Sequence, residues 1–393
     1  MGLRLNRYLH YSHQSINRED IASVIEILKS DWITQGPKIK EFEDALCHFT
    51  RAKYVVAVSN GTAALHISCL AAGIKAGDEV ITSPITFAAT ANSVLYCGGK
   101  PVFADVEEDT TNVDPCEIEK RITKRTRAII PVHFAGHPCD LKEISRIARR
   151  HRLIVIEDAA HALGAEYEIS RRRGNGEWIK VGDGRFSDMT ILSFHPVKSI
   201  TTGEGGAVLT NDQKLYEKLL MLRNHGITRE RKALLEKDEG PWYSEMQALG
   251  FNYRITDFQC ALGTSQLRRI GPFLKRRREI AALYYEKLSG LEGIVLPIAR
   301  PSVKSAWHIY CIRLKDASKR KRIFERLRDS NIGVQVHYIP VYFHPYYRRL
   351  GYKMGMCKKA EDYYRRTMTL PIHPAMTDRD VHYVIETLKE SLA

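Results

Sequence analysis

Seven short apolar runs, most of them separated by a helix-like or loop segment of a dozen or more residues, constrain the fold of this chain more than any other feature. The runs lie at residues 54–58, 79–83, 101–105, 127–134, 152–158, 189–194 and 207–210. Residues 128–132 and 153–156 are apolar on both faces, which is typical of strands in a sheet that helices cover on both sides. The alternation predicts an α/β domain with a mainly parallel sheet of seven strands.

The pattern changes near Gly271 and Pro272. A long basic helix is expected over residues 275–290, and the later strands, at 308–314 and 333–337, are sparse. A second, smaller α+β domain therefore follows the first.

We expect the large domain to cover residues 15–265 and the small domain residues 270–393, with residues 1–14 packing against the small domain. The first helix is expected over residues 15–30, with Ser15 as its N-cap. Its apolar positions follow the helical period: Ile21, Val24, Ile25 and Leu28.

The chain has 393 residues and a net charge of +14, a surplus that favours anionic partners such as nucleic acid, acidic membranes or phosphorylated small molecules. Its basic clusters are interpreted as solvated faces, because no nucleic-acid-binding motif accompanies them. We therefore expect no nucleic acid as a partner. No apolar run reaches 18 residues, so a membrane is not expected as a partner either. The Gly- and Arg-rich segment 170–184 is expected to form an exposed hairpin.

The cysteines and the N-terminus favour a cytoplasmic protein. Eight cysteines are scattered without a Cys-x-x-Cys pair, and we expect them to be reduced. The first residues lack the apolar stretch of a signal peptide. No metal site is expected, since His133 and His137 are separated by a glycine in a loop and the chain has neither a Cys cluster nor His-Glu-x-x-His.

Because open α/β sheets bind ligands beyond the carboxyl ends of their strands, residues that follow the runs are candidates for chemistry. After the first run, residues 59–66 form a small hydroxyl-bearing turn that opens a helix, which suits an anion. Ser and Asn are equally ordinary helix caps, so both interpretations stay open. Phe87 follows the second run and is either a core residue or a ring that stacks on a flat cofactor.

Two later positions give a sharper signal. Glu157 and Asp158 end a fully apolar strand, where a carboxylate is costly unless it is paired, and one of them could hold the protonated ring nitrogen of a cofactor. Lys198 follows the sixth run and precedes a glycine-rich turn. In an enclosed place its pKa would be lowered, which makes a nucleophile for imine formation. A lysine taken at random would lie on the surface.

Five motifs, in order along the chain, resemble those of the DegT/DnrJ/StrS sugar aminotransferases, which share the aspartate-aminotransferase fold. They are Ser-Asn-Gly-Thr-Ala-Ala-Leu-His at 59–66, Pro-Ile-Thr-Phe at 84–87, Glu-Asp-Ala-Ala-His-Ala-Leu-Gly at 157–164, Ser-Phe-His-Pro-Val-Lys at 193–198 with Thr-Gly-Glu-Gly-Gly at 202–206, and Gly-Phe-Asn-Tyr-Arg at 250–254. The resemblance extends from about residue 10 to residue 390.

The resemblance implies pyridoxal 5′-phosphate (PLP) as cofactor, held as an internal aldimine by Lys198. It implies further that Asp158 bonds the pyridine nitrogen and that Phe87 stacks on the ring. His161 stands where the family has Gln or His, near the ring hydroxyl.

The same resemblance assigns the cofactor phosphate to Gly61, Thr62 and Ser193. Asn252 would reach the phosphate bound by the other subunit, which implies a homodimer with shared active sites.

Within the family, the chain most resembles the transaminases of pseudaminic acid biosynthesis. The shared stretches are Tyr-Ser-x-Gln-Ser-Ile at 11–16, Thr-Gln-Gly-Pro at 34–37, Pro-Val-His-Phe-Ala-Gly at 131–136, the Phe-His-Pro-Val-Lys form at 194–198, and Gly-Val-Gln-Val-His-Tyr-Ile-Pro at 333–340. They imply transfer of an amino group from L-glutamate to carbon 4 of UDP-2-acetamido-2,6-dideoxy-β-L-arabino-hexos-4-ulose. The Arg-rich segment 170–184 is a departure from the pattern, and GDP- or dTDP-linked keto sugars are alternatives.

Four further residues are candidates for contact with the substrates. Arg254 would meet the diphosphate or the glutamate carboxylate. His195, His337 and Tyr342 are either substrate contacts or structural residues.

Two rival functions remain at this stage. One is a pyridoxamine-dependent sugar dehydratase on the same fold, which has His where this chain has Lys198. The other is a basic, non-catalytic protein that binds nucleic acid, whose binding would depend on salt and not on Lys198.

Overall fold

A seven-stranded sheet is the centre of the computed structural model, which describes residues 7–172, 175–236 and 239–392. Its strand order is β1-β9-β8-β5-β4-β2-β3, and only β9 is antiparallel to its neighbours. The strands are β1 (Tyr54–Val58), β2 (Glu79–Thr82), β3 (Lys100–Phe103), β4 (Thr126–Ile130), β5 (Ile154–Asp158), β8 (Met189–Ser193) and β9 (Gly206–Thr210). The predicted mainly parallel sheet is confirmed, and each predicted run overlaps one strand.

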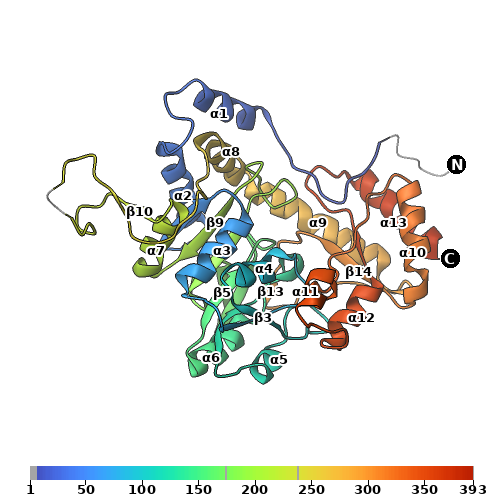
Figure 1. Ribbon diagram of the computed structural model, residues 1–393. Coiled ribbons are helices and arrows are strands. Elements are labelled where there is room, and N and C mark those ends of the chain that lie inside the picture. The colour runs from blue at the N-terminus through green and yellow to red at the C-terminus, as the bar shows by residue number, and fades with distance from the viewer. Residues whose placement is uncertain (1–6, 173–174, 237–238, 393) are drawn as a thin grey trace.

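Helices cover both faces of this sheet (Figure 1). Because successive strand residues point to opposite faces, Val55 and Ala57 of β1 belong to one core cluster while Val56 and Val58 belong to another. The helices are α1 (Arg18–Leu28), α2 (Pro37–Thr50), α3 (Gly61–Ala71), α4 (Ala89–Tyr96), α5 (Pro115–Lys120), α6 (Leu141–His151), α7 (Gln213–Arg223) and α8 (Asp257–Arg268), with the 3-10 turn η1 (Phe134–Gly136).

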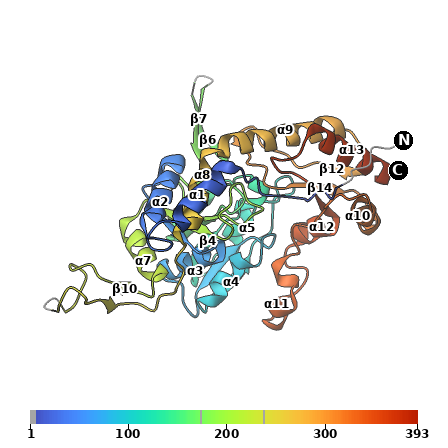
Figure 2. The same ribbon diagram turned by 90° about the horizontal axis from the view of Figure 1, so that it is seen from above.

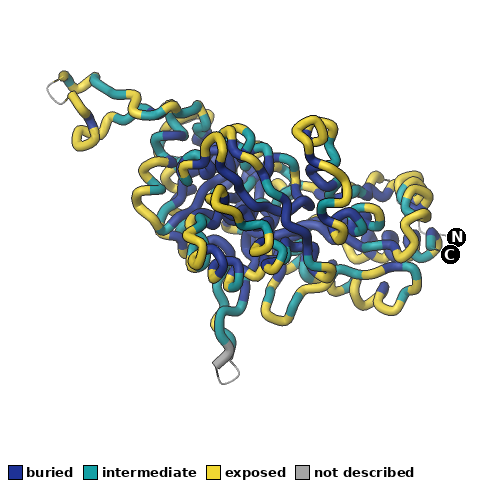
Figure 3. The backbone as a smooth tube through the Cα atoms, turned by 60° about the horizontal axis from the view of Figure 1, so that its bottom comes forward, coloured by how far each residue is buried: buried dark blue, intermediate teal, exposed yellow. Residues whose placement is uncertain are grey.

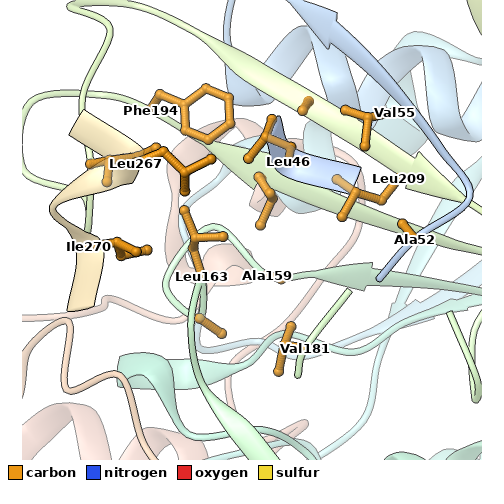
Figure 4. Close-up of a cluster of buried hydrophobic side chains, with 14 of the residues drawn as sticks. Leu46, Ala52, Val55, Ala159, Leu163, Val181, Phe194, Leu209, Leu267 and Ile270 are labelled. Atoms are coloured by element: carbon orange, nitrogen blue, oxygen red, sulfur yellow. The ribbon is translucent and has the colours of Figure 1, made fainter. Parts of the chain in front are cut away.

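One of these clusters lies directly under the loops that leave β5 and β8 (Figure 4). Ala159 follows the last residue of β5, and Phe194 follows the last residue of β8; both are fully buried. Phe194 packs against Phe42 of α2 with ring centroids 5.1 Å apart. The two loops therefore start from fixed, densely packed positions.

The C-terminal domain is built on a second, antiparallel sheet, with β14 between β12 and β15. Its core contains Ile280 and Tyr284 from one face of α9, together with residues of α10 and α13. The elements are α9 (Ile270–Leu288), β12 (Ile294–Val295), β14 (Tyr310–Leu314), η2 (Ala317–Lys319), α10 (Arg320–Asp329), η3 (Val341–Phe343), α11 (Pro345–Arg349), α12 (Lys358–Arg366), β15 (Thr367–Leu370) and α13 (Asp378–Leu392). None of the helices in the described ranges is long and apolar enough to cross a membrane.

Helix α9 links the two cores. Leu274 in its first half packs in the cluster under the large sheet, whereas Ile280 in its second half packs in the C-terminal core. Gly271 and Pro272 do not separate two elements, because proline is tolerated in the first turn of a helix, where its missing N–H has no partner. The strand predicted at residues 333–337 is wrong: that segment makes one isolated bridge, between Gln335 and Thr369.

The N-terminal segment packs on the C-terminal domain. Leu9 is buried in that core, its N–H donates to the carbonyl of Asn331 at 2.8 Å, and its own carbonyl accepts from Gly333 at 2.7 Å. Arg7 pairs with the buried carboxylate of Asp380 at 2.7 Å. Residues 1–6 of the predicted packing segment lie outside the described residues.

Helix α1 begins later than predicted and presents an apolar stripe to solvent. Ser15 is not its N-cap: the Asn17 side chain accepts the N–H of Asp20, and the Asp20 carboxylate accepts the N–H of Asn17 in return. Ile21, Ile25 and Leu28 are 52%, 44% and 58% exposed. The described part of this chain leaves that stripe uncovered.

Two segments project from the body (Figure 2). One is the hairpin of β6 (Glu166–Arg172) and β7 (Asn175–Lys180), whose base pairs with β13 (Val303–Lys304). The predicted exposed hairpin is confirmed, although it starts at Glu166 and residues 173–174 lie outside the described part. Figure 3 shows it standing clear of the buried centre.

The other projection, made of the described residues 227–236 and 239–249, is called the arm. It carries the short strands β10 (Ile227–Thr228) and β11 (Glu245–Met246), which pair with each other at its base. Four of its large apolar side chains are exposed, namely Leu235, Trp242, Met246 and Leu249, whereas Leu234 is buried.

Docking of α1 depends on a buried carboxylate, which gives a first prediction. Asp20 is fully buried and accepts hydrogen bonds from Ser265 at 2.6 Å, from Gln266 at 2.7 Å and from Arg269. Asp20→Ala leaves these donors without their acceptor and is expected to lower the free energy of unfolding by about 3 kcal/mol. Urea denaturation measures it, with Glu26→Ala on the exposed side of α1 as control. Equal stability of the two variants would contradict the docking role.

Candidate active site

Lys198 lies in the loop between β8 and β9. Its backbone N–H donates to the carbonyl of His195 at 2.8 Å, and Ser12 of the N-terminal segment donates to the neighbouring carbonyl of Val197 at 3.0 Å. Burial lowers the pKa of Lys198 to about 8, and the negative charge of Asp158 opposes that shift. A substantial fraction of the amine is therefore neutral, and so nucleophilic, close to physiological pH.

Asp158 is the last residue of β5 and is almost fully buried. Its carboxylate accepts a hydrogen bond of 2.6 Å from the Thr90 hydroxyl and one of 3.2 Å from the N–H of Ala160. Thr86 lies 2.7 Å from the Thr90 oxygen, and because Thr90 gives its own proton to Asp158, Thr86 acts as the donor to Thr90. The carboxylate is thus oriented from two sides and keeps capacity for a further donor.

The other carboxylate at this strand end, Glu157, is structural. It accepts hydrogen bonds from His133 at 2.8 Å and from Thr190 at 3.1 Å, as well as one from Ser187. Its side chain points to the opposite side of the strand from Asp158, as alternation requires. Within the described ranges, no group of three or more His, Cys, Asp or Glu residues is arranged to hold a metal ion.

The N-terminus of α3 meets the end of β8. Asn60 caps the helix by accepting the N–H of Ala63 at 2.8 Å, so the first amides of the helix are left for another acceptor. A Cβ on Gly61 would lie 3.0 Å from Cβ of Ser193 and 3.2 Å from its hydroxyl oxygen. Gly61, Thr62 and Ser193 are therefore brought together, with glycine favoured by the close approach, in an arrangement that suits an anion.

Phe87 is not a core residue. Its side chain is 64% exposed, and it lies just before α4, where its carbonyl accepts the backbone N–H of Thr90, the residue whose hydroxyl donates to Asp158. Of the two interpretations left open by the sequence, the structure excludes the core. An exposed aromatic ring beside a buried carboxylate fits a flat ligand.

His161 lies one turn after Asp158 and is buried. Its Nε2 is 3.1 Å from the hydroxyl of Tyr338, and its Nδ1 has no hydrogen-bond partner among the described residues. Burial, and then the charges of Lys198 and His337, hold the pKa of His161 well below its usual range. A buried, unpartnered ring nitrogen calls for a ligand atom.

His337 also lies beside Lys198. Its Nδ1 is 2.8 Å from the Thr369 hydroxyl, and the ring of Tyr11 lies 5.3 Å from its own. Burial, with the charge of Lys198 as the second cause, lowers the pKa of His337 to about 3. His195, by contrast, has an exposed side chain.

Tyr342 does not face the site. Its side chain is fully buried in a core cluster, its hydroxyl donates to Glu361 at 2.7 Å, and that hydroxyl accepts the N–H of Cys357 at 3.2 Å. Both hydrogen-bonding functions are used inside the domain. Of the two interpretations that the sequence left open for Tyr342, the structure therefore supports the structural one.

Within this chain, Arg254 lines a cavity that lies apart from Lys198 and Asp158. It donates to the side chain of Asn224 at 2.7 Å and borders a cavity of about 550 Å³ between α2, α7 and the base of the arm. The residues that line this cavity include neither Lys198 nor Asp158. Asn252 is exposed, and Tyr253 accepts the N–H of Ser59 beside the α3 turn.

Three residues of the site received no role from the sequence: Thr90, Tyr338 and Ser12. Ser12 and Tyr338 lie inside the stretches at 11–16 and 333–340, and Thr90 lies three residues after Phe87, beyond the motif at 84–87. Proximity to a candidate was the one available signal, because the contacts to Asp158 and His161 join segments 68 and 177 residues apart.

The geometry of a nucleophilic lysine near a buried carboxylate, with an anion site at a helix N-terminus, agrees with what comparison with known proteins shows. Residues 14–389, nearly the whole chain, match the DegT/DnrJ/EryC1/StrS aminotransferase family. The chain belongs to this family.

Two relatives are similar over almost their full length. A Bacillus subtilis protein named spore coat polysaccharide biosynthesis protein SpsC is 40% identical, over 99% of this chain and 98% of its own. A Campylobacter jejuni protein named UDP-4-amino-4,6-dideoxy-N-acetyl-beta-L-altrosamine transaminase is 37% identical, over 96% of each chain.

Two solved structures share the fold. PseC of Helicobacter pylori, an aminotransferase involved in pseudoaminic acid biosynthesis, has a TM-score of 0.89 at 32% identity, over 98% of this chain and 99% of its own. The PLP form of a Streptococcus pneumoniae sugar aminotransferase has a TM-score of 0.89 at 29% identity, over 98% of each chain. The protein is thus a PLP-dependent sugar aminotransferase with the predicted fold.

The site residues fit PLP. Asp158, Lys198 and the exposed Phe87 would hold the pyridine ring, and the N-terminus of α3 would bind the phosphate. The Nδ1 of His161, which has no partner among the described residues, is available to form a hydrogen bond with a polar atom of the cofactor. These are the positions that the motifs predicted, and the individual roles remain predictions.

The shifted pKa of Lys198 gives a second prediction. The rate at which the apo-protein captures PLP should rise with pH and reach half its maximum near pH 8, because only the neutral amine attacks the aldehyde. Asp158→Asn removes the charge that raises the lysine pKa, so the midpoint should fall below 8. Stopped-flow absorbance measures both, with the exposed Glu204→Gln as control. A midpoint near the ordinary lysine value of 10.5 would contradict the buried environment.

Proposed function

We propose that this enzyme transfers the amino group of L-glutamate to carbon 4 of a UDP-linked 4-keto-6-deoxy sugar, UDP-2-acetamido-2,6-dideoxy-β-L-arabino-hexos-4-ulose. The observation that carries aminotransfer is Lys198, a lysine with a pKa of about 8 beside the buried carboxylate of Asp158. The names of the Campylobacter relative and of PseC support this sugar. The Bacillus relative, named for a spore coat polysaccharide, favours a different nucleotide-linked keto sugar as the second candidate.

Bound PLP supplies an electron sink that stabilises negative charge at the carbon that loses its proton. Asp158 stabilises positive charge on the atom it faces, and its orientation by Thr90 and Ala160 is already set in the protein. Lys198 Nζ, when released as a free amine, takes the proton from the substrate carbon and returns it, since a pKa of about 8 suits a base near neutral pH.

The surroundings of Lys198 keep that proton transfer specific. His161, His308 and His337 are all buried, and burial lowers the pKa of each, so they are neutral at physiological pH. None of these three imidazoles then competes as a proton donor. A histidine in place of Lys198, as in the dehydratases, would lack the primary amine that forms and releases the covalent bond, so the lysine favours aminotransfer.

We propose further that two copies form a homodimer with shared active sites. Ile21, Ile25 and Leu28 recur at the helical period on one exposed face of α1, and the arm exposes four more large apolar side chains. Exposed apolar stripes of this kind are typical of protein interfaces. In this proposal Asn252 reaches the cofactor phosphate of the partner, and Arg254 meets an anionic group of the substrates.

Charge and thiol chemistry are consistent with these substrates and with the cytoplasm. The net charge of +14 attracts a nucleotide diphosphate and a dicarboxylic amino acid. All eight cysteines are free thiols, which suits a reducing compartment.

Turnover across a panel of nucleotide keto sugars tests the function. With L-glutamate, the UDP-linked 4-keto sugar should be aminated at least about tenfold more efficiently than its GDP- or dTDP-linked counterparts, since a mismatched buried polar contact costs about 1.4 kcal/mol or more. Mass spectrometry detects the amino sugar, and 2-oxoglutarate release gives the rate. Lys198→Ala should lose both activity and visible colour. Equal efficiency with every nucleotide would overturn the proposed substrate, and a wild type that binds no PLP would overturn the function.

Subunit complementation tests the shared site. Lys198→Ala and Asn252→Ala homodimers should each have low activity, because each lacks one part of both sites. In a mixed dimer, one site has lost both residues and the other has both intact. Unfolding and refolding an equimolar mixture should therefore restore up to about a quarter of wild-type activity, given random pairing and one intact site in two.

Each variant refolded alone is the control. If Asn252 served its own subunit, no site in the mixed dimer would be intact and mixing would restore nothing.

A further inference from the structure

His161 is enclosed by residues from distant parts of the chain. Its ring centroid is 4.3 Å from that of His308 and 6.5 Å from that of Phe134, and its Nε2 is 3.1 Å from the Tyr338 hydroxyl. The side chain is only 6% exposed. Solvent therefore has little access to either ring nitrogen.

The two nitrogens of His161 must differ in protonation. A neutral imidazole carries one proton, so one nitrogen donates and the other accepts a hydrogen bond. Burial lowers the pKa of His161 well below its usual range, which makes the neutral form the relevant one. Nε2 has Tyr338 as partner, while Nδ1 has none within the described ranges. Which nitrogen holds the proton decides whether Nδ1 offers a donor or an acceptor.

Tyr338 is placed independently of His161. The carbonyl of the preceding residue, His337, accepts from the Tyr363 hydroxyl at 2.9 Å, and the N–H of Val341 donates to the carbonyl of Pro84 at 2.9 Å. These contacts anchor the segment on both sides of Tyr338. Burial raises the pKa of its phenol, so the hydroxyl keeps its proton and is available as a donor.

We propose that Tyr338 donates its hydroxyl proton to Nε2 of His161 and so holds the ring in the tautomer whose Nδ1–H donates to the ring oxygen of PLP. Tyr338 is then a positioning residue that acts through His161. The inference rests on PLP as cofactor and on the roles proposed for Asp158 and Lys198, and it is independent of which sugar is the substrate.

The chemistry of PLP selects a donor at Nδ1. With the ring nitrogen at Asp158, the aldehyde carbon at Lys198 and the phosphate arm at Gly61, the remaining polar substituent is the ring oxygen, on the edge away from the phosphate. That oxygen carries negative charge in the coloured form and needs a donor. The opposite tautomer would set a lone pair of Nδ1 against it, which is repulsive in a buried site.

Tyr338→Phe keeps the ring but removes the proton donor. A hydrogen-bond donor to the ring oxygen reduces the negative charge on that oxygen. The oxygen then attracts less strongly the neighbouring proton whose loss changes the visible absorbance. Without the Tyr338 hydroxyl, the Nδ1–H of His161 is no longer held in place as this donor. The pH midpoint of the absorbance change should therefore rise by about 0.5–1 unit, as expected for one hydrogen bond. The measurement uses the holoenzyme without amino donor or sugar, so it does not depend on the proposed reaction.

A second background separates tautomer control from a merely structural role. His161→Gln supplies an amide that carries its protons on nitrogen in every state, so it needs no neighbour to place them. Adding Tyr338→Phe to His161→Gln should shift the midpoint by less than half as much as it does in the wild type. Tyr346→Phe, at an exposed tyrosine, should leave the midpoint unchanged.

Two results would overturn the inference: no shift in Tyr338→Phe, or the same shift in both backgrounds, which would indicate a packing effect. Nitrogen-15 spectra of histidine-labelled holoenzyme give a direct check, since the protonated and unprotonated ring nitrogens have well-separated resonances. The His161 signals, assigned by their absence in His161→Gln, should show protonated Nδ1 in the wild type. Protonation at Nε2 would overturn the inference.

Discussion

The attraction between a buried carboxylate and a half-buried amine is the constraint on which the rest of the site depends. Asp158 and Lys198 leave the ends of β5 and β8, which are neighbours and parallel, so both arrive at the same edge of the sheet. Burial lowers the pKa of the lysine, and the carboxylate limits that shift to a value of about 8. Burial alone would lower the pKa of the amine further, and full exposure would leave the amine protonated. The site therefore depends on both groups remaining enclosed.

Enclosure is supplied by three separate parts of the chain. The first residues of the loops after β5 and β8 pack in a core cluster, and Ser12 of the N-terminal segment donates to the carbonyl next to Lys198. Tyr338 from the C-terminal domain contacts His161. The N-terminal segment is itself anchored in the C-terminal core by Leu9. The N-terminal segment and Tyr338 therefore join the C-terminal domain to the site around Lys198, and helix α9 packs in both cores.

Much of this could be predicted from the chain, and the reasons for the failures are physical. Strands were located well because buried parallel strands need apolar residues on both faces, a pattern that little else produces. Residues 333–337 form a single bridge, between Gln335 and Thr369 of β15, because Gly333 donates instead to Leu9 of the N-terminal segment and the pairing with β15 extends no further. The two interpretations of Tyr342 stay open in the sequence because residue order does not distinguish a tyrosine that donates to the buried Glu361 from one that faces a ligand.

The sequence by itself determined the fold class and the family, and it predicted Lys198 and Asp158 as site residues, because these rest on local periodicity and on motifs of a few adjacent residues. Only the tertiary structure decided that Thr90 orients Asp158, that Glu157 is hydrogen-bonded to His133 and that Tyr338 is hydrogen-bonded to His161. Those contacts join residues far apart along the chain, and a hydrogen bond depends on distances of a few tenths of an ångström. Residue order alone does not contain that information until the sheet and its loops bring the groups together.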